Sequence, residues 1–97
     1  MGIGVIVEFN FESGGADALT ELMKGRFSKT RSWPGCENIY LGIDEEDPNR
    51  LFLVQKWTGR DEYNRYREWA MDQPGTEKLM PLLIGEMKTT YLEDTSA

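Results

Sequence analysis

The stretch that decides the fold is Leu51 to Trp69, LFLVQKWTGRDEYNRYREW. An apolar, strand-like run ends at Trp57, a polar break follows, and a helical pattern rich in aromatic residues begins. Large amphipathic rings are costly to leave in water, so aromatic side chains on one helix face beside a strand-end tryptophan predict the wall of an aromatic-lined cavity. This stretch therefore indicates a small-molecule site, although it contains no obvious catalytic motif.

The residues before this stretch predict two strands and a helix. Alternating apolar residues predict a strand over residues 3 to 11, and a stripe that includes Arg26 predicts a helix over residues 16 to 27. The turn signal Trp33-Pro34-Gly35 precedes a second alternating run over residues 36 to 43. An acidic connection over residues 44 to 50 then leads into the strand 51 to 57, so these two strands are expected to pair as an antiparallel hairpin.

The residues after Trp57 predict a helix, a short helical piece and a last strand. Thr58 or Asp61 is the expected cap of the helix that carries Tyr63, Tyr66 and Trp69. Pro74-Gly75 ends this helix, and residues 76 to 83 form a short helical piece whose regularity Pro81 limits. Residues 86 to 92 alternate as a fourth strand, and residues 93 to 97 are expected to be a frayed tail.

The resulting order β-α-β-β-α-β predicts an α+β, ferredoxin-like fold with a four-stranded antiparallel sheet. Two helices cover one face of the sheet, and the other face stays open with a mixed set of side chains: Glu8, Asn10, Asn38, Tyr40, Phe52, Val54 and Thr90. Pairing two such sheets buries these faces, so a homodimer is expected.

Length and composition bound the class of protein. The 97 residues are expected to form one domain, and the net charge of −6 disfavours nucleic acid and anionic lipid as partners. No apolar run approaches the roughly 20 residues that a membrane-spanning helix needs, and no export signal is seen, so a cytoplasmic protein is expected. Cys36 is the only cysteine, which fits a reducing compartment and a small buried apolar role.

Histidine is absent from the chain. Its absence excludes a Ser-His or Cys-His nucleophile, a histidine-ligated metal site and a histidine-ligated haem within one chain. Proton transfer must then fall to carboxylates, tyrosines, lysines or the substrate.

Several residues together resemble the antibiotic biosynthesis monooxygenase (ABM) domain family. They are the apolar run of the first strand, the segment Trp33-Pro34-Gly35-Cys36-Glu37, the acidic hairpin ending in Asn49-Arg50, Trp57, and Tyr63 six residues later. The resemblance covers nearly the whole chain and implies a dimeric α/β barrel. It also implies that some members oxidise planar phenolic or quinonoid molecules with O₂ and without a metal, flavin or other cofactor.

The resemblance identifies Trp57 and Tyr63 as the expected catalytic pair. Trp57 Nε1-H and the Tyr63 hydroxyl are candidate donors to a ketone or phenolate oxygen. The rest of the expected pocket is apolar or aromatic, which suits a planar ring system: Phe9, Leu22, Phe27, Leu53, Tyr66 and Leu83.

Two other functions stay open. The oxygenases of the family have an asparagine four residues before the tryptophan, and Leu53 occupies that position here. A module that binds an aromatic metabolite without turning it over is therefore one alternative. An isomerase or decarboxylase that uses a carboxylate base such as Glu8 is the other, provided that Glu8 faces the ligand. Arg26 is a candidate contact for an anionic ligand, with a solvated surface arginine as its plainer interpretation.

Overall fold

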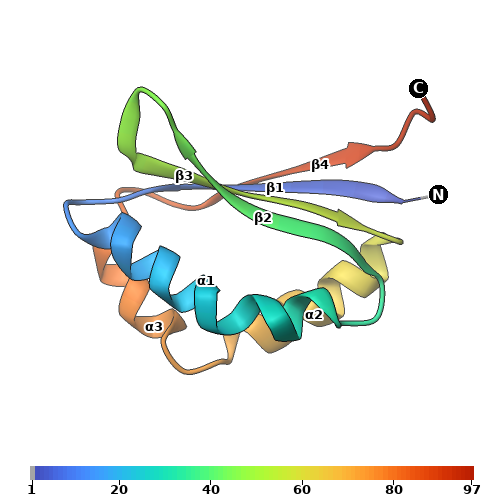
Figure 1. Cartoon of the computed structure of the whole chain (residues 1–97), viewed down its shortest axis with the longest axis horizontal. Helices are drawn as coiled ribbons and strands as arrows, with labels where there is room; N and C mark the ends of the chain where they lie inside the picture. The colour runs from blue at the N-terminus through green and yellow to red at the C-terminus, as the bar shows by residue number, and fades with distance from the viewer. Residues whose placement is uncertain (1) are drawn as a thin grey trace.

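A computed structural model of the protein describes residues 2–97 (Figure 1). Its elements follow in the order β1 (Ile3–Asn10), α1 (Gly15–Arg31), β2 (Cys36–Asp44), β3 (Asp47–Trp57), α2 (Arg60–Met71), α3 (Thr76–Leu79), the 3₁₀ turn η1 (Met80–Leu82) and β4 (Lys88–Glu93). The strands form one antiparallel sheet in the order β2-β3-β1-β4. This topology confirms the ferredoxin-like fold predicted from the sequence.

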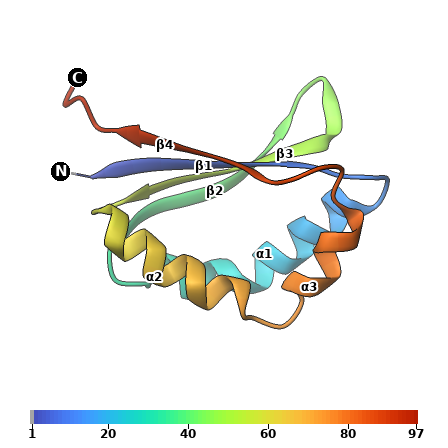
Figure 2. The same cartoon turned by 180° about the vertical axis from the view of Figure 1, so that it is seen from behind.

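The helices cover one face of the sheet and leave the other face open, as the two side views show (Figures 1 and 2). The strand registers place Val7, Leu53 and Thr89 side by side under the helices, and Ile6, Val54 and Thr90 side by side on the open face. Side chains alternate between the two faces of a strand, so each strand contributes to both surfaces. The open face predicted from the sequence is therefore present in the structure.

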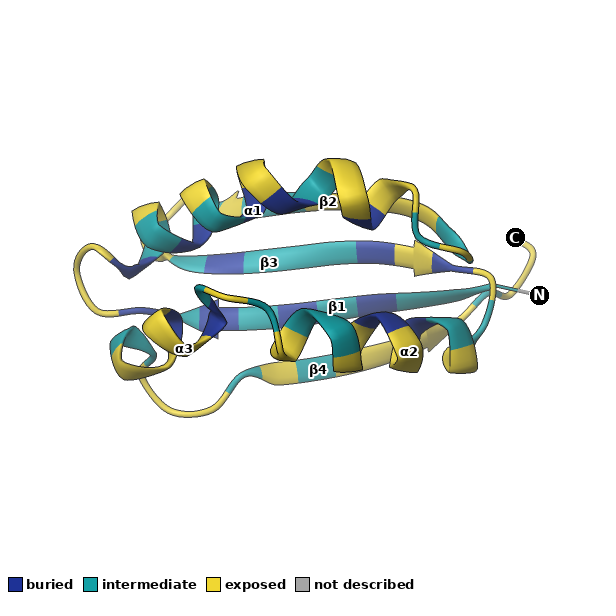
Figure 3. Ribbon diagram, turned by 90° about the horizontal axis from the view of Figure 1, so that it is seen from below, coloured by how far each residue is buried: buried dark blue, intermediate teal, exposed yellow. Residues whose placement is uncertain are grey.

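The core lies between the sheet and the helices (Figure 3). On α1 the buried residues are spaced three or four apart, as a helix packed along one stripe requires: Gly15, Leu19, Met23, Arg26 and Thr30. Apolar side chains of β1 and β3 meet this stripe from the sheet: Val5, Val7, Phe9, Leu51 and Trp57. One member of the helical stripe, Arg26, is charged.

Two boundaries differ from the sequence prediction by four residues each, and one expected helix cap is absent. Helix α1 continues four residues beyond Phe27, because Thr30 is buried and bonded in the core. Strand β3 begins at Asp47 rather than Leu51, because Asp44 and Asp47 pair across a tight turn and the acidic segment therefore extends the hairpin. The expected side-chain cap of α2 is wrong, since the helix begins at Arg60 after Gly59 and no side chain caps it.

The last strand is shifted toward the C-terminus, since β4 begins at Lys88, two residues later than predicted. Strand β4 runs to Glu93, one residue further than predicted, and Asp94 accepts a hydrogen bond from Lys56 Nζ at 2.7 Å. A backbone hydrogen bond joins the segment before β4 to the end of β1: Ile84 N donates to Asn10 O at 2.7 Å. Residues 83 and 84 therefore close one end of the space between the sheet and the helices.

Candidate functional site

A cavity of about 90 Å³ lies between the sheet and the three helices. Five residues that the sequence predicted for the pocket line it: Phe9, Leu53, Tyr63, Tyr66 and Leu83. They come from β1, β3, α2 and the segment after η1, so the site exists only once these distant parts of the chain pack together. The prediction of an aromatic-lined cavity beside the strand that ends in Trp57 agrees with this arrangement.

Trp57 lies behind the wall of the cavity and does not line it. Its side chain is fully buried, and its ring packs against those of Tyr66 and Tyr63 at centroid distances of 5.0 and 5.9 Å. Its Nε1-H donates to Gln55 Oε1 at 3.0 Å, so the only donor of the indole is already used. The expected hydrogen bond from Trp57 to a ligand therefore does not fit this geometry, and Trp57 instead supports the residues that do face the cavity.

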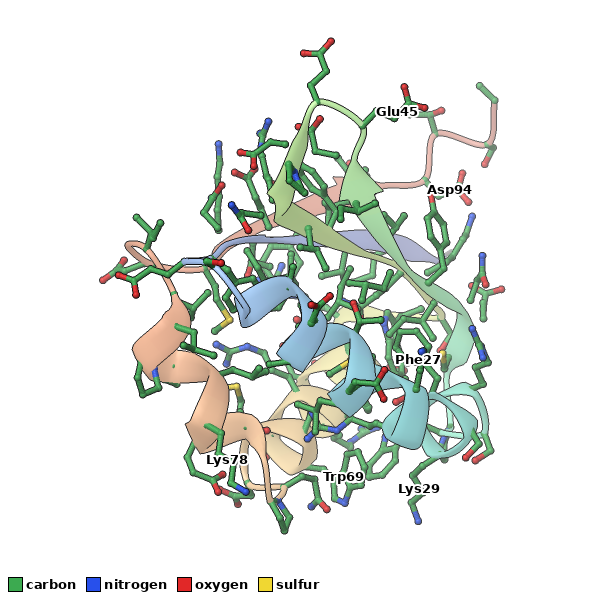
Figure 4. All side chains as sticks on the ribbon, turned by 60° about the vertical axis from the view of Figure 1, so that its left-hand side comes forward. Phe27, Lys29, Glu45, Trp69, Lys78 and Asp94 are labelled. Atoms are coloured by element: carbon green, nitrogen blue, oxygen red, sulfur yellow. The ribbon has the colours of Figure 1, made fainter. Side chains whose placement is uncertain are left out.

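Leu22 and Phe27 lie outside the cavity, contrary to the sequence prediction. Leu22 borders a separate surface groove beside Trp69, and Phe27 lies under the guanidinium of Arg31 at 4.9 Å, near β2. Figure 4 shows Phe27 and Trp69 on different parts of the helical layer. The reason is helical geometry: residues 19, 23, 26 and 30 face the sheet, so residues 22 and 27 point to the two sides of that stripe.

Gln55 is a site residue that the sequence analysis missed. It is 5% exposed, lines the cavity and sits on the same face of β3 as Leu53 and Trp57. Because the indole of Trp57 donates to Oε1, the amide orientation is settled, and Nε2 has no protein acceptor within residues 2–97. The signal was available, since period-two alternation in β3 places a glutamine among otherwise apolar inward positions.

The two tyrosines of the cavity differ in what their hydroxyls do. Tyr66 is bonded to Thr30, whose Oγ1 lies 2.9 Å from the Tyr66 hydroxyl and itself donates to the carbonyl of Arg26 at 3.2 Å. The Tyr66 proton is therefore committed to Thr30. Tyr63 is 3% exposed, and its hydroxyl has no hydrogen-bond partner in the part of the chain that the structure describes. Burial raises the pKa of Tyr63 to about 12, so this hydroxyl stays protonated and able to donate at neutral pH.

Arg26 is a residue for which the sequence left two interpretations open, a contact for an anionic ligand or a solvated surface arginine. It is 9% exposed, it lines the cavity, and its guanidinium lies 5.9 Å from the ring centroid of Trp69. Its Nη2 donates to Thr76 Oγ1 at 3.1 Å, and that hydroxyl donates in turn to the carbonyl of Ala70 at 2.9 Å. Burial lowers the pKa of Arg26, which still leaves the guanidinium charged at neutral pH.

No carboxylate lines the cavity among residues 2–97. Glu8, the candidate base of the isomerase alternative, lies on the open face of the sheet and forms an ion pair with Arg50 at 3.2 Å. The condition for that alternative is therefore not met. Within the described residues there is no group of three or more Cys, Asp or Glu side chains placed to hold a metal ion, and no helix long and apolar enough to span a membrane.

Comparison with solved structures shows the same fold in other proteins. A conserved protein from Methanosarcina mazei Go1 has a TM-score of 0.81 at 14% identity, over 98% of this chain and 94% of that chain. Rv0793 from Mycobacterium tuberculosis has a TM-score of 0.79 at 20% identity, over 97% and 95%. A protein described as an antibiotic biosynthesis monooxygenase has a TM-score of 0.76 at 18% identity, over 96% and 98%.

Comparison at the level of sequence gives the family. No curated protein matches the chain. The family described as "Antibiotic biosynthesis monooxygenase" (ABM) matches residues 2–70, which include β1, α1, the β2–β3 hairpin and most of α2. The matched segment contributes Arg26, Gln55 and Tyr63 to the cavity. The chain therefore belongs to the antibiotic biosynthesis monooxygenase family.

Proposed function

We propose that the protein is a cofactor-independent monooxygenase that oxidises a phenol or hydroquinone of a single ring with O₂. One observation carries the proposal: Tyr63 and Gln55 line one small, mostly apolar cavity, and each has a neutral donor, the hydroxyl and the amide, with no acceptor among residues 2–97. Such a site can hold a ring and stabilise negative charge on its oxygen while excluding water. Membership of the monooxygenase family supports the same class of reaction.

The size of the cavity supports a single ring rather than a polycyclic substrate. An apolar cavity of about 150 Å³ is known to accommodate benzene, and the cavity here is about 90 Å³. Four methionines border it: Met23 is buried, Met71 and Met80 are exposed, and Met87 is the fourth. Methionine side chains adapt their shape readily, so a modest opening of this rim admits one ring. A planar system of three or four rings requires the helices to separate.

The proposed chemistry begins with the phenolate form of the substrate. Hydrogen bonds to a charged oxygen contribute about 1.5 to 3 kcal/mol each, and 1.36 kcal/mol corresponds to one pKa unit. Two such bonds, from Tyr63 and Gln55, stabilise a bound phenolate and offset the burial that raises the pKa of a phenol in this cavity, as it does for Tyr63. The phenol gives its proton to solvent water before the cavity closes around the phenolate, so no protein carboxylate is needed as base.

The phenolate of a hydroquinone is itself the reductant. One electron passes to O₂, and the resulting radical pair forms a bond between a ring carbon and oxygen. Loss of water from this hydroperoxide leaves a hydroxyquinone, so hydroquinone and O₂ give hydroxyquinone and H₂O with all atoms and electrons accounted for. The protein's residues bind the ring, hold its oxygen and keep water out.

The test is O₂ uptake by metal-stripped protein with a panel of single-ring hydroquinones. Tyr63→Phe should lower kcat about tenfold to hundredfold, because it removes a hydrogen bond to charge. Tyr40→Phe is the matched control, since Tyr40 is 51% exposed and does not line the cavity, and its loss of a hydroxyl should leave turnover within about twofold. No uptake across the panel, or equal effects of the two variants, contradicts the proposal.

A binding module is the second candidate function, and the position of Leu53 favours it. Leu53 lines the cavity at the position where the oxygenases of this family have an asparagine. Gln55, one inward position further along β3, offers an amide to the same cavity and favours the oxygenase. Ligand-induced thermal stabilisation without O₂ uptake would support the binding module.

We further propose that the protein works as a cytoplasmic homodimer of one-domain chains, with the open faces of two sheets packed together. Apolar side chains stand on that face beside charged ones, among them Ile6, Phe52 and Val54, and Leu92 is 46% exposed. Val54→Lys places a charge at the centre of this face and should give a monomer by sedimentation equilibrium. An unchanged molar mass for this variant would exclude the sheet face as the interface.

A further inference from the structure

Arg26 is a buried charge without a counter-ion among residues 2–97. Arg26 is 9% exposed. No carboxylate among residues 2–97 lies within ion-pair distance of its guanidinium. Within the described part of the chain, the guanidinium donates one hydrogen bond, to the neutral hydroxyl of Thr76. Buried charges in proteins are nearly always paired, because an unpaired charge in a poorly hydrated site is costly.

Thr76 positions the guanidinium but does not neutralise it. The Thr76 proton is donated to the carbonyl of Ala70, so its oxygen is free to accept from Arg26 Nη2. Arginine has five N–H donors, and only this one has an acceptor in the described chain. Arg26 lines the cavity on one side and, on the other, the surface groove that Glu21, Lys29 and Trp69 also border.

The charges around the cavity have one sign. The chain as a whole carries a net charge of −6, yet the charged residues that line the cavity are Arg26 and Arg67. The negative net charge disfavours polyanions, whereas the two arginines at the cavity supply local positive charge for a small anion. A planar carboxylate matches the guanidinium fork with two parallel hydrogen bonds.

We infer that the cavity takes a single-ring aromatic acid, with its carboxylate paired to Arg26 and its ring held between the sheet and α2. A carboxylate carries one negative charge against the single buried guanidinium, whereas a phosphate monoester would bring nearly two. That the ligand contains an aromatic ring, and that it is oxidised, rests on the proposed function. The anion site rests on Arg26 alone. The substrate is then a hydroxylated benzoate, oxidised at its phenolic part near Tyr63 and Gln55.

The test is equilibrium binding of benzoate and benzamide, two rings of nearly equal shape that differ in charge. The protein should bind benzoate about ten- to hundredfold more tightly than benzamide by calorimetry, as hydrogen bonds between charged groups allow. NMR signals of the cavity residue Leu83 should shift with benzoate. Equal affinity for the two compounds, or benzoate binding that leaves Leu83 unshifted, overturns the inference without any variant.

Two variants test whether Arg26 causes the preference for benzoate over benzamide. Arg26→Gln should abolish the preference for benzoate and leave the affinity for benzamide within about twofold. Lys29→Gln is the matched control, because Lys29 is an exposed cation on the same helix and lies outside the cavity. If Arg26→Gln does not fold, Thr76→Val gives the same information, since it releases the guanidinium and should weaken benzoate selectively.

Failure of this inference is distinguishable from failure of the proposed function. Benzoate selectivity that depends on Arg26, with no O₂ uptake for any hydroxylated benzoate or hydroquinone, supports the anion site and refutes the oxygenase. O₂ uptake with neutral hydroquinones that Arg26→Gln leaves unchanged, with no preference for acids, supports the oxygenase and refutes the anion site.

Discussion

The hydrogen bond between Trp57 and Gln55 should be a main support of the cavity wall. Gln55→Leu keeps the size of the side chain and removes the only acceptor of an indole N–H that is fully buried. An unsatisfied buried donor costs about 1 to 3 kcal/mol, which is the expected loss in the free energy of unfolding. For a domain of this size each kcal/mol lowers the midpoint of thermal unfolding by about 4 to 8 °C.

The assay is thermal and urea denaturation at one fixed protein concentration, because a dimer makes the midpoint depend on concentration. Gln73→Leu is the control, since Gln73 donates to the Trp69 carbonyl at 3.3 Å but is only partly buried, and a loss below about 0.5 kcal/mol is expected. The double variant with Trp57→Phe should lose less than the sum of the single variants. A Gln55→Leu protein as stable as the wild type, or strictly additive losses, would refute the reasoning.

Three further outcomes follow from the contacts described above. Tyr66→Phe should cost about 1 kcal/mol of unfolding free energy in a denaturant titration, because it removes the bond to Thr30, and an unchanged midpoint would contradict that role. Gly35→Ala should cost about 1 to 3 kcal/mol, since Gly35 has a φ of +93° and a Cβ there would lie 2.6 Å from Glu62 Cβ. Glu8→Gln should flatten the acid side of the stability curve against pH. The hydrogen bonds from Arg50 lower the pKa of Glu8, so its contribution is present above the ordinary glutamate pKa and lost as the pH falls through the folded-state value.

The fold could be predicted from the sequence because its signals are local. Alternation in the strands, the helical stripe of α1 and the turn at Trp33-Pro34-Gly35 each depend on neighbouring residues, and together they gave the βαββαβ order that the structure confirms. The same local patterns misjudged the boundaries of β3 and α2. Pairing of Asp44 with Asp47 and the start of α2 at Arg60 depend on contacts and backbone geometry that propensity does not encode.

The candidate site was only half visible in the sequence. Amphipathic spacing showed which residues face inward, and Phe9, Tyr63 and Tyr66 accordingly line the cavity. Spacing does not show which polar atoms are already bonded, because the acceptor of Trp57 and the partner of Tyr66 come from side-chain packing.

The sequence by itself determined the family, the order of elements and the two faces of the sheet, since these follow from local periodicity and from residues matched along the chain. Only the tertiary structure decided which donors are free. It placed Trp57 behind the wall with its N–H used. It also brought Arg26 of α1 to Thr76 of α3, fifty residues away, and gave Arg26 no ion pair among residues 2–97. The physical reason is that hydrogen-bond satisfaction and charge pairing are properties of the packed core, in which residues distant in sequence become neighbours.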